Sequence, residues 1–354
     1  MDLHHHQPAQ SCENDSCNLT GHMRNQIKPP SHRLSRRDLI RGACWGAAAM
    51  TTVTTTGCVP SSGHGQVELV WGRRGQSSGR FLKPRAITID RNDQLYIVDT
   101  TGRIQVFDRD GNWLREWRTP QTKNGRPTGL AIKQAEVPDD DLLLVADTHY
   151  YRMLVYTLDG RRVQEQEIGG TAGRNPGEFA FVTDAVADRD GCFYIGEYGD
   201  SDRIQKFDPD GKFMVQWGGT GREVEKFVRP QSLLIADDVL WVADACNHRI
   251  QRYDISVPTP RWIDAWGSQG DQPGQFHYPY DLALVDDGGL LVCEYGNQRI
   301  QRLNADGSPR SIWGAPGFEV GQLYQPWGLV IDSRNRMHIL DSNNHRVQRT
   351  RLPA

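Results

Sequence analysis

The sequence predicts an all-β fold: a six-bladed β-propeller of four-stranded antiparallel blades, with the last blade closed by an N-terminal strand. Three observations predict it. The stretch ADACNHRIQRYD at 243–254 has counterparts at five other places, short alternating strands surround each copy, and QVELVWG at 66–72 aligns with the strands that end the repeats. A period of 47–50 residues is typical of repeat architectures, and four short strands per repeat are typical of propeller blades.

Each copy of the motif holds an acid at the end of one strand and an arginine at the start of the next. Successive acids are 48, 50, 47, 50 and 47 residues apart. A buried carboxylate needs a partner, and a pair that every blade contains serves a need common to all blades. We therefore predict structural ion pairs between Asp99 and Arg103, Asp147 and Arg152, Glu197 and Arg203, Asp244 and Arg249, Glu294 and Arg299, and Asp341 and Arg346.

The rest of each repeat predicts the other strands. A Phe-x-x-Pro segment leads into the first strand, and an Asp-Gly turn between alternating apolar residues predicts the last hairpin. The second repeat lacks the Phe-x-x-Pro segment, and the fourth lacks the Asp-Gly turn. The sixth repeat stops after three strands, so QVELVWG should supply its fourth. The lead segments are Phe81/Pro84, Phe227/Pro230, Phe276/Pro279 and, as a variant, Leu323/Pro326.

The acid, the Asn-His-Arg-Ile-Gln-like run and the Phe-x-x-Pro segment together resemble NHL-repeat six-bladed propellers. The resemblance is clearest at DACNHRIQRYD and DSNNHRVQRTR and covers about residues 66–352. It implies the fold but not one chemistry, because the family includes protein-binding and RNA-binding platforms, sensor domains and a few lyases.

The N-terminal region differs in composition from the repeats. Residues 1–34 are polar and predict a disordered leader. Residues 35–58 resemble a twin-arginine export signal with Arg36 and Arg37, and they end in a lipoprotein-type cleavage box that would acylate Cys58. A linker at 59–65 precedes the propeller at 66–354. We therefore expect an exported protein, periplasmic or in the cell envelope, attached to the membrane only through acyl chains.

A candidate binding site lies where the repeats differ. The loop before the first strand and the loop between strands two and three share one face of a propeller. Two repeats place an acid two residues after the proline position, and the same two carry Glu-Tyr-Gly after the second strand. The predicted channel mouth consists of Arg85, Asp184, Glu197, Tyr198, Asp281, Glu294, Tyr295 and Trp327, with Arg85 opposite the acids and aromatic residues.

Two functions remain open at this mouth. A binding or scaffolding module would take a protein, peptide or glycan ligand, because tyrosine and tryptophan faces pack on such ligands and carboxylates accept their hydrogen bonds. The alternative is a metal-dependent lyase or lactonase. Calcium would lie between Asp184 and Asp281, whereas zinc would require His149, His248 and His345 to converge. The net charge of −3 argues against nucleic acid, and we expect a monomer.

Overall fold

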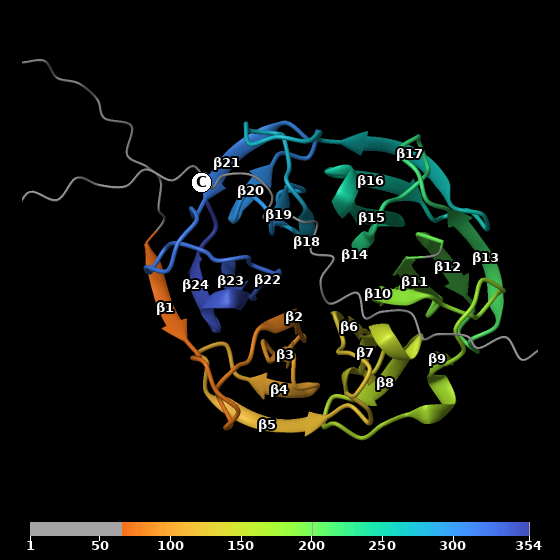
Figure 1. Ribbon diagram of the computed structural model, residues 1–354, viewed down its shortest axis with the longest axis horizontal. Helices are drawn as coiled ribbons and strands as arrows, with labels where there is room; N and C mark the ends of the chain where they lie inside the picture. The colour runs from red at the N-terminus through yellow and green to blue at the C-terminus, as the bar shows by residue number, and fades with distance from the viewer. Residues whose placement is uncertain (1–65, 200, 354) are drawn as a thin grey trace, which may run out of the picture. The chain divides into compact units, whose positions relative to one another are not determined.

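The computed structural model describes residues 66–199 and 201–353 (Figure 1). The predictions for residues 1–65, which include Arg36, Arg37 and Cys58, lie outside the described residues. Within the described part of the chain, no helix is long and apolar enough to span a membrane.

The described residues form six antiparallel sheets of four strands, which confirms the predicted fold class. In Figure 1 the first strand of each sheet lies nearest the centre, and the inner strands contact one another around a closed ring. The blades are: blade 1, β2 (Pro84–Ile89), β3 (Leu95–Asp99), β4 (Arg103–Phe107) and β5 (Trp113–Arg118); blade 2, β6 (Gly129–Lys133), β7 (Leu142–Asp147), β8 (Arg152–Thr157) and β9 (Ile168–Gly169); blade 3, β10 (Phe181–Ala187), β11 (Phe193–Tyr198), β12 (Arg203–Phe207) and β13 (Phe213–Gly218); blade 4, β14 (Pro230–Ala236), β15 (Val239–Asp244), β16 (Arg249–Asp254) and β17 (Arg261–Trp266); blade 5, β18 (Pro279–Leu284), β19 (Leu290–Glu294), β20 (Arg299–Leu303) and β21 (Pro309–Trp313); blade 6, β22 (Gly328–Ile331), β23 (Arg336–Asp341), β24 (Arg346–Arg351) and β1 (Val67–Trp71).

Blade 6 closes the ring with the predicted N-terminal strand. β1 pairs antiparallel with β24, with Val70 opposite Gln348 and Trp71 opposite Val347. This pairing satisfies the outer edge of β24, which would otherwise expose a row of unpaired backbone groups.

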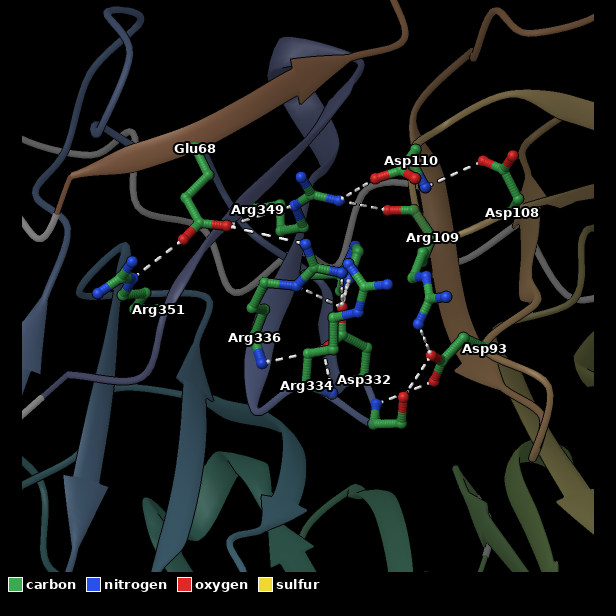
Figure 2. Close-up of polar contacts among 12 residues, drawn as sticks. Glu68, Asp93, Asp108, Arg109, Asp110, Asp332, Arg334, Arg336, Arg349 and Arg351 are labelled. Carbon is green, nitrogen blue, oxygen red and sulfur yellow. Dashed lines mark hydrogen bonds and ion pairs between the residues drawn. The ribbon is translucent and has the colours of Figure 1, made fainter.

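Charged side chains reinforce the same seam (Figure 2). The Glu68 carboxylate of β1 lies 3.7 Å from Arg349 Nε and 3.2 Å from Arg351 Nε, both on β24. Arg349 also donates to Asp110 at 2.7 Å, so that β24 is joined to the last hairpin of blade 1. The seam therefore links the first and last blades by charge as well as by strand pairing.

The apolar core is divided among the six interfaces between adjacent blades. Each buried cluster combines side chains from two neighbouring blades, and the interface between blades 6 and 1 contains Trp71, Phe81 and Phe107. Blade faces are apolar on both sides because each sheet is covered twice, so a blade has no stable core of its own. Closure of the ring therefore completes the sixth interface, between blades 6 and 1.

All six predicted acid–arginine pairs are ion pairs, and all six acids are completely buried. Asp244 shows the full arrangement: its carboxylate accepts hydrogen bonds from the Val228 backbone N–H, Arg249 and Gln251. Arg249 and Gln251 in turn donate to the Lys226 carbonyl in the loop before β14. The motif is thus a clamp that fixes the lead loop of blade 4, and the equivalent acids of blades 1, 3, 5 and 6 also accept a backbone N–H of their lead loops.

Two details of the repeat were not predicted. Blade 3 does have a lead segment, because buried Phe179 forms the same parallel bridge as Phe81 and Phe227. The Phe-x-x-Pro pattern is absent in this segment because Val182 takes the place of the proline. The spacing of 48 residues between Phe179 and Phe227 is the sequence signal that could have identified it. In blade 2 the outer strand is reduced to Ile168–Gly169 behind a 3-10 turn at Gln164–Gln166.

Candidate functional site

The channel mouth is built on the face that holds the lead loops and the loops between the second and third strands, here called the top face. Tyr280 is the second residue of β18 and Tyr295 follows β19, and their rings stack with centroids 4.5 Å apart. Trp327, which precedes β22, packs edge-on against both rings at 5.1 and 5.7 Å. This contact confirms that the two sets of loops share one face.

Two arginines complete the mouth by stacking on these rings. The Arg85 guanidinium lies 5.3 Å from the Trp327 centroid. The Arg229 guanidinium lies 4.8 Å from the Tyr198 ring and 5.5 Å from the Tyr280 ring. Arg85 is therefore beside the aromatic residues and not opposite them, because blades 1 and 6 are neighbours in the closed ring.

Asp184 and Asp281 lie deeper, where they narrow the channel. Asp184 accepts the backbone N–H groups of Ala185 and Leu233, each at 2.9 Å. Asp281 accepts the Ser232 hydroxyl and the Leu329 N–H, also at 2.9 Å. These bonds join the inner strands of blades 3, 4, 5 and 6. We call Asp184, Ser232 and Asp281 the collar.

Glycines in the neighbouring blades make room for the collar. A Cβ at Gly129 would lie 2.5 Å from Asp184 Oδ1, and a Cβ at Gly328 would lie 2.9 Å from Asp281 Oδ2. The cavity above the collar measures only about 20 Å³, room for about one water. The collar therefore forms the floor of the mouth.

Burial raises the pKa of Asp184 to about 7 and that of Asp281 to about 6. The charge of Asp281 adds to the rise at Asp184, whereas the backbone N–H donors oppose it at both groups. Each carboxyl group is thus easier to protonate in the folded chain than in the unfolded chain.

This difference predicts a pH-dependent stability. Between pH 3.8 and about pH 7, Asp184 holds a proton in the folded chain but has lost it in the unfolded chain. The free energy of unfolding therefore falls as the pH rises through this range. The double variant Asp184→Asn and Asp281→Asn removes this term. Its melting temperature relative to the native protein should rise between about pH 4.5 and about pH 8, by roughly 10–20 °C for a combined contribution of about 5 kcal/mol from the two groups. Melting curves that shift in parallel at both pH values would contradict the raised pKa values.

Glu197 and Glu294 do not line the mouth, although the sequence placed them there. Both are completely buried in their blades. Glu197 pairs with Arg203 and accepts the Ala180 N–H, and Glu294 accepts the His277 N–H at 2.9 Å. These carboxylates point into their blades because each accepts a hydrogen bond from a backbone N–H of a lead loop.

His248 and His345 each accept a hydrogen bond from a lead loop. His248 Nδ1 accepts the Tyr278 N–H at 3.1 Å, and His345 Nδ1 accepts the Lys83 N–H at 2.9 Å. Burial lowers the pKa of His248 to about 4, so its imidazole stays neutral and able to accept. Within 66–199 and 201–353, no group of three or more His, Cys, Asp or Glu residues is arranged to hold a metal ion. The divalent cation at Asp184 and Asp281 stays a prediction.

Sequence reasoning missed two residues of the mouth, Arg229 and Tyr280. Tyr280 directly precedes Asp281, and Arg229 directly precedes the proline of its lead segment. The positions were visible in the repeat alignment. The alignment could not show that the Arg229 side chain contacts tyrosines of both neighbouring blades, Tyr198 of blade 3 and Tyr280 of blade 5.

Comparison with known proteins supports the repeat. Residues 323–349 match the family described as NHL repeat. NHL repeat-containing protein 3 of Homo sapiens is 29% identical over 219 residues, which cover 60% of each chain. The protein of the same name from Mus musculus is 29% identical over 213 residues, covering 57% of this chain and 58% of that one. The chain thus spans about 60% of the length of these curated relatives.

Solved structures show the same fold at low identity. A putative gluconolactonase superposes with a TM-score of 0.57 at 12% identity, covering 79% of this chain and 92% of that chain. A streptogramin B lyase superposes with a TM-score of 0.54 at 14% identity, covering 80% and 86%. At this identity the likeness concerns the fold alone. Residues 66–353 are a six-bladed β-propeller, and its last blade contains a segment that matches the NHL repeat.

Proposed function

We propose that the whole ring is an NHL-type binding and scaffolding module that takes a peptide, protein or glycan ligand in its top-face mouth. The observation that carries the proposal is the continuous contact of Tyr198, Arg229, Tyr280, Tyr295, Trp327 and Arg85 across five blades. Tyrosine, tryptophan and arginine are the residue types that dominate binding energy at interfaces. The residue types at the mouth differ from blade to blade, whereas the acid–arginine pairs recur in every blade.

The location of this module is part of the proposal. Arg36 and Arg37 would direct export of the folded chain, and acyl chains on Cys58 would hold it at the outer side of the membrane. Lysine at both arginine positions should leave the protein in the cytoplasmic fraction. Recovery of that variant at the wild-type level in the cell envelope would refute the export signal.

A binding experiment tests the mouth. The labelled full-length chain is applied to an array of peptides and oligosaccharides, beside the variants Trp327→Ala and Trp113→Ala. Trp113 lies on the outer strand β5 and is 43% exposed, so it controls for the loss of an indole ring elsewhere. Trp327→Ala should weaken binding by about 30-fold, equivalent to about 2 kcal/mol at a central contact. Equal effects of the two variants would place the ligand outside the mouth.

A further inference from the structure

The lead loop of blade 6 presents apolar side chains to solvent on the top face. Phe318 is 68% exposed, Val320 is 59% exposed and Tyr324 is 36% exposed. The Phe318 and Tyr324 rings meet edge-on, with their centroids 5.1 Å apart. We call these three side chains the loop patch. Exposed apolar side chains that gather in one place mark interaction sites, whereas single ones need no explanation.

The other blades show that the fold does not require a phenylalanine at 318. The preceding residue, Gly317, donates its backbone N–H to the Leu323 carbonyl, and a glycine in blades 1, 3, 4 and 5 makes the equivalent bond. The residue after that glycine is exposed in each of these four loops, and its backbone carbonyl accepts from the clamp arginine. Its side chain is polar in all four: Gln76, Arg174, Arg222 and Asp271. The stability of the loop therefore does not account for Phe318.

The loop patch continues the aromatic surface of the mouth. The backbone N–H of Gln325, next to Tyr324, donates to Gln298 Oε1 at 3.3 Å, and Gln298 lies in the same loop as Tyr295. Burial raises the pKa of the Tyr295 hydroxyl, and the nearby Tyr324 adds to that rise. The Tyr295 ring in turn contacts Trp327. The mouth and the loop patch are thus neighbouring parts of one face.

The surroundings define the chemistry of the partner. Phe318 and Val320 have no hydrogen-bonding side-chain group, so they suit an apolar side chain better than a sugar. The cavity above the collar has room for about one water, so a ligand has to lie over the face and not inside it. Glu319 lies between the two apolar residues in sequence, is exposed, and forms no ion pair among the described residues. Its carboxylate therefore favours a cation beside the apolar contact.

We propose that the loop patch docks a peptide segment of a partner protein in which an apolar side chain is followed by a lysine or arginine. This inference rests on the proposed function, because it names the class of partner for the same face. The apolar side chain packs on Phe318 and Tyr324, and the basic side chain pairs with Glu319. The apolar contact supplies most of the affinity, whereas the exposed ion pair mainly sets the association rate and its salt dependence.

The experiment titrates the full-length chain with three synthetic peptides that place Phe-Lys, Phe-Glu or Ser-Lys at the centre of the same Gly-Ser sequence. The Phe-Lys peptide should bind about 10-fold more tightly than either of the others. The variant Phe318→Gln installs the residue that blade 1 holds at this position, so it should keep the native melting temperature. It should bind the Phe-Lys peptide only as weakly as the native chain binds the Ser-Lys peptide.

Val224→Ser is the matched control, because Val224 is 54% exposed in the lead loop of blade 4, where the same Glu-Val pair follows an arginine. This variant should bind like the native chain, whereas Glu319→Lys should reverse the preference between Phe-Lys and Phe-Glu.

Equal affinities for the three peptides, no binding of any of them, or an equal loss in the Val224 variant would overturn the inference. So would a dimer of the native chain that Phe318→Gln dissociates, because the loop patch would then belong to a second copy. Array ligands that require Trp327 but not Phe318 would overturn it while leaving the proposed function standing.

Discussion

Alanine at Asp244 is expected to lower the free energy of unfolding by about 3–5 kcal/mol, the usual result of leaving a buried charge without its partner. The Asp244 carboxylate is completely buried and accepts hydrogen bonds from Val228, Asn247, Arg249 and Gln251. Its removal would strand the Arg249 guanidinium and release the lead loop of blade 4. Chemical denaturation of the purified variant measures the loss.

Asp147 supplies the matched control for this clamp. It is equally buried, but it accepts from Arg152 at 3.0 Å while its Oδ1 has no hydrogen-bond partner among the described residues. Burial raises its pKa to about 6, a sign of a weakly compensated carboxylate. Asp147→Ala should therefore cost only about 1–2 kcal/mol. Equal losses for the two variants would contradict the clamp as the source of stability.

Alanine at Trp71 should cost about 3–5 kcal/mol by leaving a cavity in the closing interface. The Trp71 ring lies 4.5 Å from Phe107 and 5.8 Å from Phe81, and it is 9% exposed. It also covers Gly111, where a Cβ would lie 2.5 Å from the indole. Because β1 joins the last blade to the first, the loss should weaken the whole ring.

Thermal denaturation of Trp71→Ala and Trp113→Ala side by side checks this expectation. Trp113 is exposed on β5, so its replacement should change the free energy of unfolding by no more than about 0.5 kcal/mol. Trp71→Ala should also associate in solution if the edge of β24 opens. A Trp71 variant as stable as the Trp113 variant would show that the seam does not depend on β1.

The fold could be predicted because repetition multiplies a weak local signal by six. The pairs at Asp99 and Arg103 and at Asp341 and Arg346 occupy equivalent positions, so an error at one repeat is corrected by the others. The same logic located the missing strand at 66–72. Where a repeat departed from the pattern, as at Phe179, the sequence motif failed although the spacing was preserved.

The site could be predicted only in part, because side-chain direction depends on competition for hydrogen-bond donors. Alignment placed Tyr295, Trp327 and Arg85 on the correct face. It could not show that lead-loop backbone donors draw Glu197 and Glu294 into their blades. Nor could it show that Asp184 and Asp281 accept hydrogen bonds from the inner strands of the neighbouring blades.

The central claim is that function depends on the residues in which the blades differ, whereas the repeated residues serve stability. One paired measurement tests it: the dissociation constant for the best array ligand and the melting temperature, in Asp244→Ala and in Trp327→Ala. The claim predicts that the first variant melts earlier yet binds normally per folded molecule, and that the second binds about 30-fold more weakly per folded molecule. Weak binding by the folded Asp244 variant, or normal binding by the Trp327 variant, would contradict it.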